Sequence, residues 1–310
     1  MEESPLVSIA MCTYNGAKFL TGQLDTIVNQ TYKNLEVIVV DDCSTDETIS
    51  ILRRYAEKHL NFRIYQNDCN LGFAGNFERA LGYCKGDLIA LCDQDDLWHH
   101  QKIELQVSAL NDNVFIYHDS AFIDEEGASI GKQLSDLMCL YRGSDPEAFL
   151  FFNCVSGHSI LMKRALLDYA LPLKKDCFHD WWLAYVATNI GKIDFIPECL
   201  VKYRQHRAGE TNILRLSREK NKNQQSGYQN FKKNVTWLSY CSSFKANREK
   251  TLIHNTYKAY QERISKSISF RLGWILFRRR KTMLYMLKKP FWSKLNYIRK
   301  QIIGLDVRKP

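Results

Sequence analysis

Three aspartates, Asp93, Asp95 and Asp96, lie within four residues directly after the apolar run 88–92, whose composition predicts a buried strand. Like charges this close repel one another, and burying them is costly without a compensating cation. In extended or turn geometry Asp93 and Asp95 face the same side. Carboxylate oxygens at that spacing suit Mg²⁺ or Mn²⁺, which also bind diphosphate oxygens. The alternative is a cap for the following helix, but a cap needs only one aspartate.

A second acidic pair, Asp41 and Asp42, follows the apolar run 35–40. A carboxylate at a strand end can accept hydrogen bonds from a nucleobase imide or a ribose hydroxyl. Ordinary turn chemistry explains this pair about equally well. The next polar residues, 44–46, are sufficiently explained as caps of the helix that follows.

The stretch 70–81 joins a loop containing Gly72 and Gly75 to a helix that Asn76 could cap. Glycines permit a close approach of the backbone, and exposed amides at a helix start favour a phosphate. The stretch matches neither GxGxxG nor GxxxxGK[ST], so a plain glycine-rich turn is the alternative.

Asp180 stands where a helix over 181–189 is predicted to begin. The positive end of a helix favours the ionised carboxylate, which can accept the proton of an attacking hydroxyl group. The alternative makes Asp180 a helix cap and His179 a surface residue. Further along, Arg204 and His206 follow the last predicted strand. They could stabilise negative charge on a ligand, or could simply be a solvated strand end.

Alternating strand-like and helix-like segments position these groups. Strands are expected at 7–12, 35–40, 62–66, 88–92 and 114–117, with helices at 19–30, 47–59, 76–84 and 101–110 between them. Repeated units of this kind predict a parallel sheet covered by helices on both faces, with ligands at the carboxyl ends of the strands. The polar clusters do follow the strands. A helix at 146–152, strands at 159–162, 192–196 and 200–203, and the helix at 181–189 are expected to complete the same domain.

Composition excludes several classes of protein. The 310 residues include ten scattered cysteines without a CxxC pair, which indicates free thiols in a reducing compartment and argues against a zinc site. No apolar run is long enough to cross a bilayer. The acidic first residues, MEESPLVSIAM, do not resemble a secretory signal. We therefore expect a cytoplasmic protein.

The net charge of +9 is concentrated at the end of the chain, because residues 271–310 carry +11 and residues 1–270 therefore sum to −2. A stripe of apolar residues recurs there at steps of three or four, with lysines and arginines between its members: Leu284, Leu287, Phe291, Leu295, Ile298 and Ile302. This pattern is typical of an amphipathic helix in a membrane interface, interrupted near Pro290 and ending at Gly304. Anionic lipid would attract it by about 1 kcal/mol per basic residue.

Packing of this stripe against the catalytic domain or a second subunit is the alternative. Nucleic acid is not an expected partner, because no recognised binding motif accompanies the charge. We divide the chain into a catalytic domain, residues 1–212, and a helical basic region, residues 213–310.

Several motifs occur in a fixed order: Val7-Ser8-Ile9, Thr13-Tyr14-Asn15-Gly16, Val40-Asp41-Asp42-Cys43-Ser44-Thr45-Asp46, Asn70-Leu71-Gly72 and Asp93-Gln94-Asp95-Asp96-Leu97-Trp98. Over about residues 5–206 they resemble the inverting family 2 glycosyltransferases. The resemblance implies the α/β GT-A fold, a Rossmann-like, mostly parallel sheet flanked by helices, here with a basic helical extension.

The resemblance also implies roles for individual residues. Asp93 and Asp95 would hold Mg²⁺ or Mn²⁺ against the diphosphate of a sugar nucleotide, and Asp180 in His179-Asp180-Trp181 would be the catalytic base. The remaining donor-binding positions that it implies, or that the motifs above suggest, are Thr13, Asp41, Asp42, Gly72, Arg204 and His206.

The Asp-Gln-Asp-Asp-x-Trp and His-Asp-Trp-Trp elements look most like bacterial rhamnosyltransferases that use dTDP-L-rhamnose. Such enzymes imply a lipid-linked glycan acceptor at the inner face of the membrane, in O-antigen or capsule synthesis. Two other classes remain open. One is a metal-dependent phosphohydrolase or nucleotidyltransferase, although the phosphohydrolase motif has threonine or valine at the position of Asp96. The other is a non-catalytic, membrane-bound scaffold.

Overall fold

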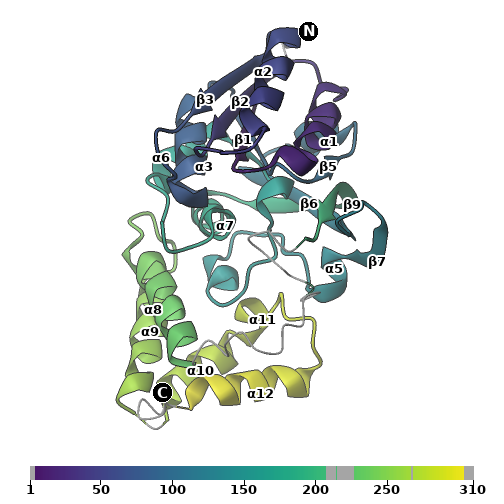
Figure 1. Cartoon of the computed structure of the whole chain (residues 1–310). Coiled ribbons are helices and arrows are strands. Elements are labelled where there is room, and N and C mark those ends of the chain that lie inside the picture. Colours follow the sequence, from purple (N-terminus) through teal and green to yellow (C-terminus); the bar gives the residue numbers. More distant parts are fainter. Residues whose placement is uncertain (1–3, 207–213, 215–226, 267, 304–310) are drawn as a thin grey trace.

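A computed structural model describes residues 4–206, 214, 227–266 and 268–303. Within them, the strands form a nine-stranded mixed sheet, which lies in the upper part of the molecule in Figure 1, above the C-terminal helices. Its first four strands lie parallel in the order β3-β2-β1-β4 and are β1 (Val7–Thr13), β2 (Leu35–Asp41), β3 (Phe62–Gln66) and β4 (Leu88–Cys92). Thr13 at the end of β1 lies opposite Asp41 at the end of β2. The predicted parallel arrangement is therefore confirmed for these four strands, whose polar loops share one edge, but not for the strand predicted at 114–117, which is β6 (Phe115–Ile123) and pairs antiparallel with β8 (Leu161–Lys163).

The second half of the sheet is mixed. β8 (Leu161–Lys163) lies antiparallel between β4 and β6 (Phe115–Ile123), and β9 (Ile193–Arg204) runs parallel to β6. The two strands predicted at 192–196 and 200–203 are one strand, whose register shifts opposite Asp119. Two short strands were not predicted: β5 (Leu97–Trp98), which pairs with β9, and β7 (Ser129–Gln133), which pairs with β6.

Alternate residues of a strand point to opposite faces of the sheet, and both faces carry apolar side chains. Helices therefore cover both faces. Ile9 and Met11 share a core with Leu20 of α1, whereas Ala10 shares a different core with Phe77 of α3. The long helices of this part are α1 (Ala17–Val28), α2 (Thr48–Lys58), α3 (Gly72–Tyr83), α4 (Lys102–Leu110) and α7 (His179–Ile190). Side chains of α1, α2 and α4 belong to the first core, and those of α3 and α7 to the second.

Two helix predictions need correction. α3 begins at Gly72, so Asn76 does not cap it; the Asn76 side chain is buried inside the helix and donates to the backbone oxygen of Val40 at 2.9 Å. The helix predicted at 146–152 is a single 3₁₀ turn, Pro146–Phe149. The remaining short elements are α5 (Leu134–Leu137), α6 (Leu167–Ala170) and the 3₁₀ turns Gly157–Ser159, Arg164–Leu166 and Glu262–Ile264.

The C-terminal region is helical and packs on the predicted catalytic domain (Figure 1). It contains α8 (Gly227–Ser243), α9 (Lys250–Gln261), α10 (Phe270–Arg278), α11 (Arg280–Met283) and α12 (Phe291–Ile302). Trp237 of α8 packs on Trp181 of α7 with ring centroids 4.7 Å apart, and the Tyr185 hydroxyl group donates to the Cys241 oxygen at 3.0 Å. The two regions therefore share one hydrophobic core.

Two details of the predicted C-terminal organisation lie outside the described residues: the boundary at 212/213 and the helix end at Gly304. Among the residues that are described, no helix combines the length and the apolar character that crossing a membrane would need.

Candidate active site

A cleft of about 1130 Å³ opens where the carboxyl ends of the parallel strands meet the first turn of α7. Seven of the predicted site residues line this cleft: Asp42, Gly72, Asp93, Asp95, Asp180, Arg204 and His206. Thr13 and Asp41 are buried and are not among the lining residues. Segments up to about 190 residues apart in the chain thus meet at one site.

The end of β9 holds the aspartate-rich turn in place. The backbone nitrogen of Arg204 donates to Asp96 Oδ1 at 2.9 Å, and its guanidinium Nε donates to the backbone oxygen of Asp95 at 2.8 Å. His206 Nε2 lies 2.8 Å from Asp95 Oδ2. On the other side of the turn, the Gln94 amide pairs with the backbone of Tyr14, accepting at 2.9 Å and donating at 3.0 Å. The turn is therefore fixed from both sides by residues distant in sequence.

Two sets of side chains could hold a cation, and both include Asp93. Asp93, Asp96 and His158 bring their ligand atoms within 4.8 Å of one another, and His158 Nδ1 lies 3.2 Å from Asp96 Oδ2. Among the described residues no group makes a hydrogen bond to this oxygen of the fully buried Asp96, the nearby His158 included, and burial raises the pKa of Asp96 well above its usual range. The second set, Asp93, Asp95 and His206, lines the cleft, which Asp96 does not, and His206 contacts Asp95, but among the described residues only the first set brings its three ligand atoms within 4.8 Å of one another.

Carboxylate oxygens are the ligands that Mg²⁺ and Mn²⁺ prefer, so the aspartates of both sets fit the predicted metal, whereas an imidazole is more typical of Zn²⁺ or iron sites. Sequence reasoning gave no role to Asp96 as a ligand and missed His158. The latter sits in a 3₁₀ turn 62 residues after Asp96 and carries no local motif.

The predicted nucleoside residues are engaged with the protein itself. Asp41 Oδ1 accepts from the Thr13 hydroxyl group at 2.9 Å, and Asp41 Oδ2 accepts from the backbone nitrogen of Ser44 at 2.9 Å. Asp42 accepts from the backbone nitrogens of Leu71 at 2.8 Å and Gly72 at 2.9 Å. The loop amides expected to face a phosphate are thus directed at Asp42.

Tyr14, the residue after Thr13, is 48% exposed and lines the cleft.

Asp180 lies in the first turn of α7, as predicted, while Phe178 occupies the cap position. It accepts from the backbone nitrogen of Trp181 and from Asn153 Nδ2 at 3.3 Å. Desolvation raises the pKa of Asp180 to about 7, the nearby charge of Asp93 adds to this rise, and the hydrogen bonds partly oppose it. The carboxyl group is therefore poised between its acid and base forms near neutral pH.

His179 is buried, so the alternative that placed it on the surface is wrong. Its ring stacks on Phe77 with centroids 4.1 Å apart, and neither ring nitrogen has a hydrogen-bond partner among the described residues. Burial lowers the pKa of His179 to about 4, which keeps the ring neutral. His179 also lines the cleft, where its free nitrogens can serve a ligand.

The wall of the cleft changes character along its length. Tyr14, Asn15 and Asn70 come from the loops after the parallel strands, whereas an apolar group comes from α5, α7 and the segment after the Pro146 turn. The apolar group is Leu134, Met138, Phe151, Phe152 and Trp181. One part can therefore receive a polar nucleotide and the other a less polar partner.

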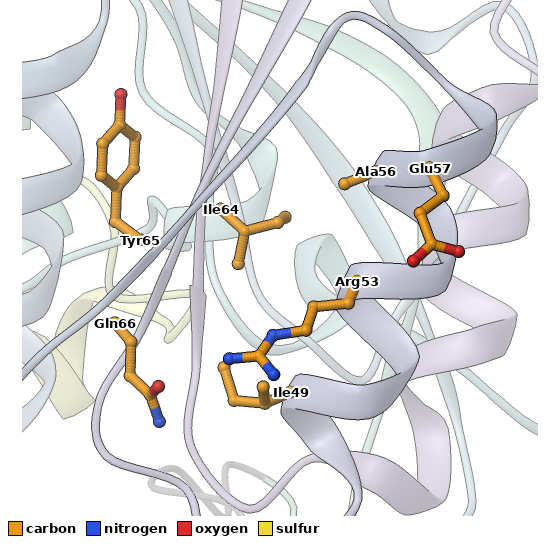
Figure 2. Close-up of a pocket in the computed structure, with 7 residues that line it drawn as sticks. All are labelled: Ile49, Arg53, Ala56, Glu57, Ile64, Tyr65 and Gln66. Atoms are coloured by element: carbon orange, nitrogen blue, oxygen red, sulfur yellow. The ribbon is translucent and has the colours of Figure 1, made fainter.

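A second, smaller hollow of about 480 Å³ lies between α2 and β3 (Figure 2). It is lined by Ile49, Arg53, Ala56, Glu57, Ile64, Tyr65 and Gln66, none of which is a predicted site residue. Glu57 is its one carboxylate. The larger cleft is therefore the candidate active site.

Comparisons with known proteins show the family and the fold. Residues 8–170 match the family described as Glycosyl transferase family 2. An uncharacterised glycosyltransferase of Haemophilus influenzae is 32% identical over 217 residues, which is 66% of this chain and 67% of that protein. The UDP-Glc:alpha-D-GlcNAc-diphosphoundecaprenol beta-1,3-glucosyltransferase WfgD of Escherichia coli is 28% identical over 193 residues, 61% of this chain and 73% of WfgD.

Two solved structures share the fold. TarS of S. aureus in complex with UDP-GlcNAc matches with a TM-score of 0.61 and 15% identity, over 96% of this chain and 88% of that one. The mannosyltransferase PcManGT of Pyrobaculum calidifontis, in complex with GDP-Man and Mn²⁺, matches with a TM-score of 0.57 and 20% identity, over 96% and 80%.

Proposed function

The chain belongs to glycosyl transferase family 2 and has the GT-A fold, and from this premise we propose that it is a metal-dependent, inverting glycosyltransferase. It would move a sugar from a nucleotide diphosphate to a hydroxyl group of a glycan. The observation that carries the proposal is the placement of Asp180, a carboxyl group with a pKa of about 7, on the same cleft wall as Asp93 and Asp95.

The cation would be held by Asp93 and Asp95, with His206 as a third donor. We favour this set over Asp93, Asp96 and His158, whose ligand atoms lie within 4.8 Å of one another, because all three of its side chains line the cleft, and an ion that also binds a diphosphate needs ligands there. Mg²⁺ or Mn²⁺ bound here would neutralise the charge that develops on the leaving nucleotide. The guanidinium group of Arg204 adds positive charge at the same wall.

Donor binding would use the loops after β1 and β2. Thr13 and Asp41 fix the loop that presents Tyr14, and the exposed Tyr14 ring can stack on a nucleobase. Asp42 fixes the loop at Gly72, and it lines the cleft where a ribose hydroxyl group could reach it. These residues would orient the nucleoside mainly by shaping its pocket.

The chemical step would be an in-line displacement. The acceptor oxygen forms a bond to the anomeric carbon as its proton passes to Asp180. The bond from that carbon to the diphosphate breaks, and its electron pair leaves with the nucleotide. Attack from the face opposite the leaving group inverts the anomeric centre.

Donor and acceptor are proposed more narrowly from resemblance. The motif subgroup favours L-rhamnose from dTDP-L-rhamnose. A lipid-linked glycan in O-antigen or capsule synthesis is favoured as acceptor, because the similar protein WfgD is named for a diphosphoundecaprenol-linked acceptor. An enzyme that uses such an acceptor would work in the cytoplasm at the inner face of the membrane.

Family membership favours sugar transfer over the phosphohydrolase, nucleotidyltransferase and scaffold alternatives. A thermal-shift screen of sugar nucleotides with and without Mn²⁺, followed by a transfer assay with the best donor, tests this. Asp180→Asn should keep donor binding and lose transfer. The control Asp168→Asn, an exposed first-turn aspartate of α6, should keep both. Near-normal transfer by Asp180→Asn would remove the base assignment, and donor hydrolysis without an acceptor requirement would favour the phosphohydrolase.

A further inference from the structure

The apolar stripe predicted to contact lipid is mostly used for packing within the protein. Leu284 and Ile298 are buried, and Leu295 and Ile302 pack against the main core. A Cβ atom on Gly273 of α10 would lie 2.9 Å from Ile302 Cγ2, which shows how closely α10 and α12 approach each other. The packing alternative therefore holds for this stripe.

One member of the stripe, Phe291, and four further large apolar side chains are left exposed on the same helices. Phe270, Trp274 and Phe277 follow one another at helical spacing on α10, with exposed fractions of 76%, 61% and 42%. Phe291 and Trp292 open α12, and the Trp292 side chain is 76% exposed. Large aromatic groups gathered on one face usually mark an interaction surface.

Arginine side chains pack on three of these rings, and one of them bridges α10 and α12. The Arg280 guanidinium carbon lies 4.5 Å from the ring centre of Phe277 and 6.0 Å from that of Phe291. Phe291 in turn touches Trp292, with ring centroids 5.5 Å apart. Arg278 lies 5.4 Å from the ring centre of Trp274. We call the surface formed by the five aromatic residues with Arg278 and Arg280 the aromatic–arginine face.

The charge of this segment indicates what could cover the face. Residues 268–303 contain ten lysines and arginines and no aspartate or glutamate. Arg279 is paired with Glu147 of the catalytic part at 3.2 Å, but Lys281, Lys289 and Arg299 are exposed. Aromatic rings beside many cations complement a layer of anionic lipid headgroups above an apolar interior.

We propose that the aromatic–arginine face docks on an anionic lipid bilayer, with the rings of Trp274 and Trp292 between the headgroups. Figure 1 shows α10 and α12 along one edge of the molecule, with α11 between that edge and the catalytic part. The arginines and lysines contact lipid phosphates there, and no helix needs to cross the membrane.

The docked face is connected to the apolar part of the cleft. Phe152, which lines the cleft, packs on Tyr297 of α12 with ring centroids 5.3 Å apart. The backbone nitrogen of Cys139 donates to the Met286 oxygen at 3.0 Å, and Lys288 Nζ donates to the Ser135 oxygen at 2.8 Å. If the proposed function holds, docking brings the apolar cleft wall near the bilayer, where a lipid-linked acceptor presents its sugar.

Vesicle sedimentation of the full chain tests the face without donor or acceptor. The protein should sediment with phosphatidylglycerol–phosphatidylcholine vesicles, bind pure phosphatidylcholine less, and be released by salt. Trp274→Ala with Trp292→Ala should weaken binding at least about tenfold, because two interfacial rings are lost. Arg278→Gln with Lys281→Gln should weaken it as well. Tyr169→Ala, another exposed aromatic residue, is the matched control and should bind like the natural sequence.

Tryptophan fluorescence gives an independent readout, because Trp98, Trp182 and Trp237 are buried whereas Trp274 and Trp292 are exposed. Anionic vesicles should shift the emission of the natural sequence to the blue and leave the double tryptophan variant unshifted. Several outcomes overturn the proposal: no vesicle binding, equal binding by the double variant, or a concentration-dependent dimer that dissociates in that variant. Thermal shifts with sugar nucleotides are measured separately on the same variants and should be unaltered. Failure of this proposal is therefore distinguishable from failure of the proposed function.

Discussion

At the scale of single residues, Asp180 should impose a pH dependence on transfer. Its carboxyl group must be ionised to accept a proton, and burial raises its pKa to about 7. Below pH 7 the protonated form dominates, so kcat/KM should rise about tenfold per pH unit and level off above pH 7. Initial rates across this range check the profile, with donor binding measured in parallel to separate chemistry from binding. A flat profile from about pH 5.5 to 8 would exclude Asp180 as the base.

The metal ligands can be separated by two isosteric substitutions in the same turn. Asp95→Asn should lower Mn²⁺-dependent donor binding about tenfold or more, because Asp95 lies on the cleft wall. Asp96→Asn should have the smaller effect, since Asp96 is fully buried and its Oδ1 only has to accept from Arg204. Calorimetry with Mn²⁺ and a nucleoside diphosphate measures both. The reverse order would assign the ion to Asp93, Asp96 and His158.

How much of the site can be predicted from the sequence depends on whether the partners of each residue are near it in the chain. The cluster at Asp93 to Asp96 can be predicted because its neighbouring carboxylates repel one another and a bound cation would offset that repulsion. The role of Asp42 cannot be predicted in this way, since its partners are backbone amides about 30 residues away, at Leu71 and Gly72. Likewise, nothing near His179 in the chain indicates burial against Phe77.

At the scale of elements, Gly16 couples two motifs that the sequence presents separately. A Cβ atom on Gly16 would lie 2.1 Å from Gln94 Oε1, and Gln94 stands between the two predicted metal ligands. Gly16→Ala should therefore displace Gln94 and weaken metal-dependent donor binding, which calorimetry can measure. Gly82→Ala is the matched control, because its Cβ meets nothing within 4 Å and alanine favours the helix by up to about 1 kcal/mol. Equal donor binding by both variants would contradict this coupling.

Strands and helices are predicted correctly where the hydrophobic periodicity extends over the whole element. All four parallel strands and the helices between them were predicted, because apolar runs and helical spacing are local signals. β5 has only two residues, Leu97 and Trp98, and exists because they pair with β9. The predicted start of α3 is wrong for two reasons. The helix begins at Gly72, which has a positive φ of 74°. The polar side chain of Asn76 hydrogen-bonds to Val40 and Asn67, which lie outside the helix, and does not cap it.

At the scale of the whole molecule, the C-terminal helices share a hydrophobic core with the catalytic part, so we expect the two to unfold together. Composition suggests a separate basic region after residue 212, because charge is visible in sequence and inter-helix packing is not. The structure places Trp237 of α8 against Trp181 and Trp182 of α7, the helix that carries Asp180. Removal of the C-terminal helices would therefore expose the core beside the base, so deletion is a poor test of membrane binding.

A single substitution at this contact tests the shared core. Trp237→Ala removes a buried ring that also donates through Nε1 to the Leu150 oxygen at 3.2 Å, and should cost about 3–5 kcal/mol of unfolding free energy. Trp274→Ala, which removes an exposed ring, should change stability by about 0.5 kcal/mol or less. Denaturant unfolding followed by circular dichroism and by fluorescence should give one coincident transition in the natural sequence. In Trp237→Ala that single transition should move to lower denaturant as a whole, because loss of the α7 contact destabilises both regions together. Two separate transitions, with only one of them shifted, would show instead that the basic helices unfold independently of the catalytic part.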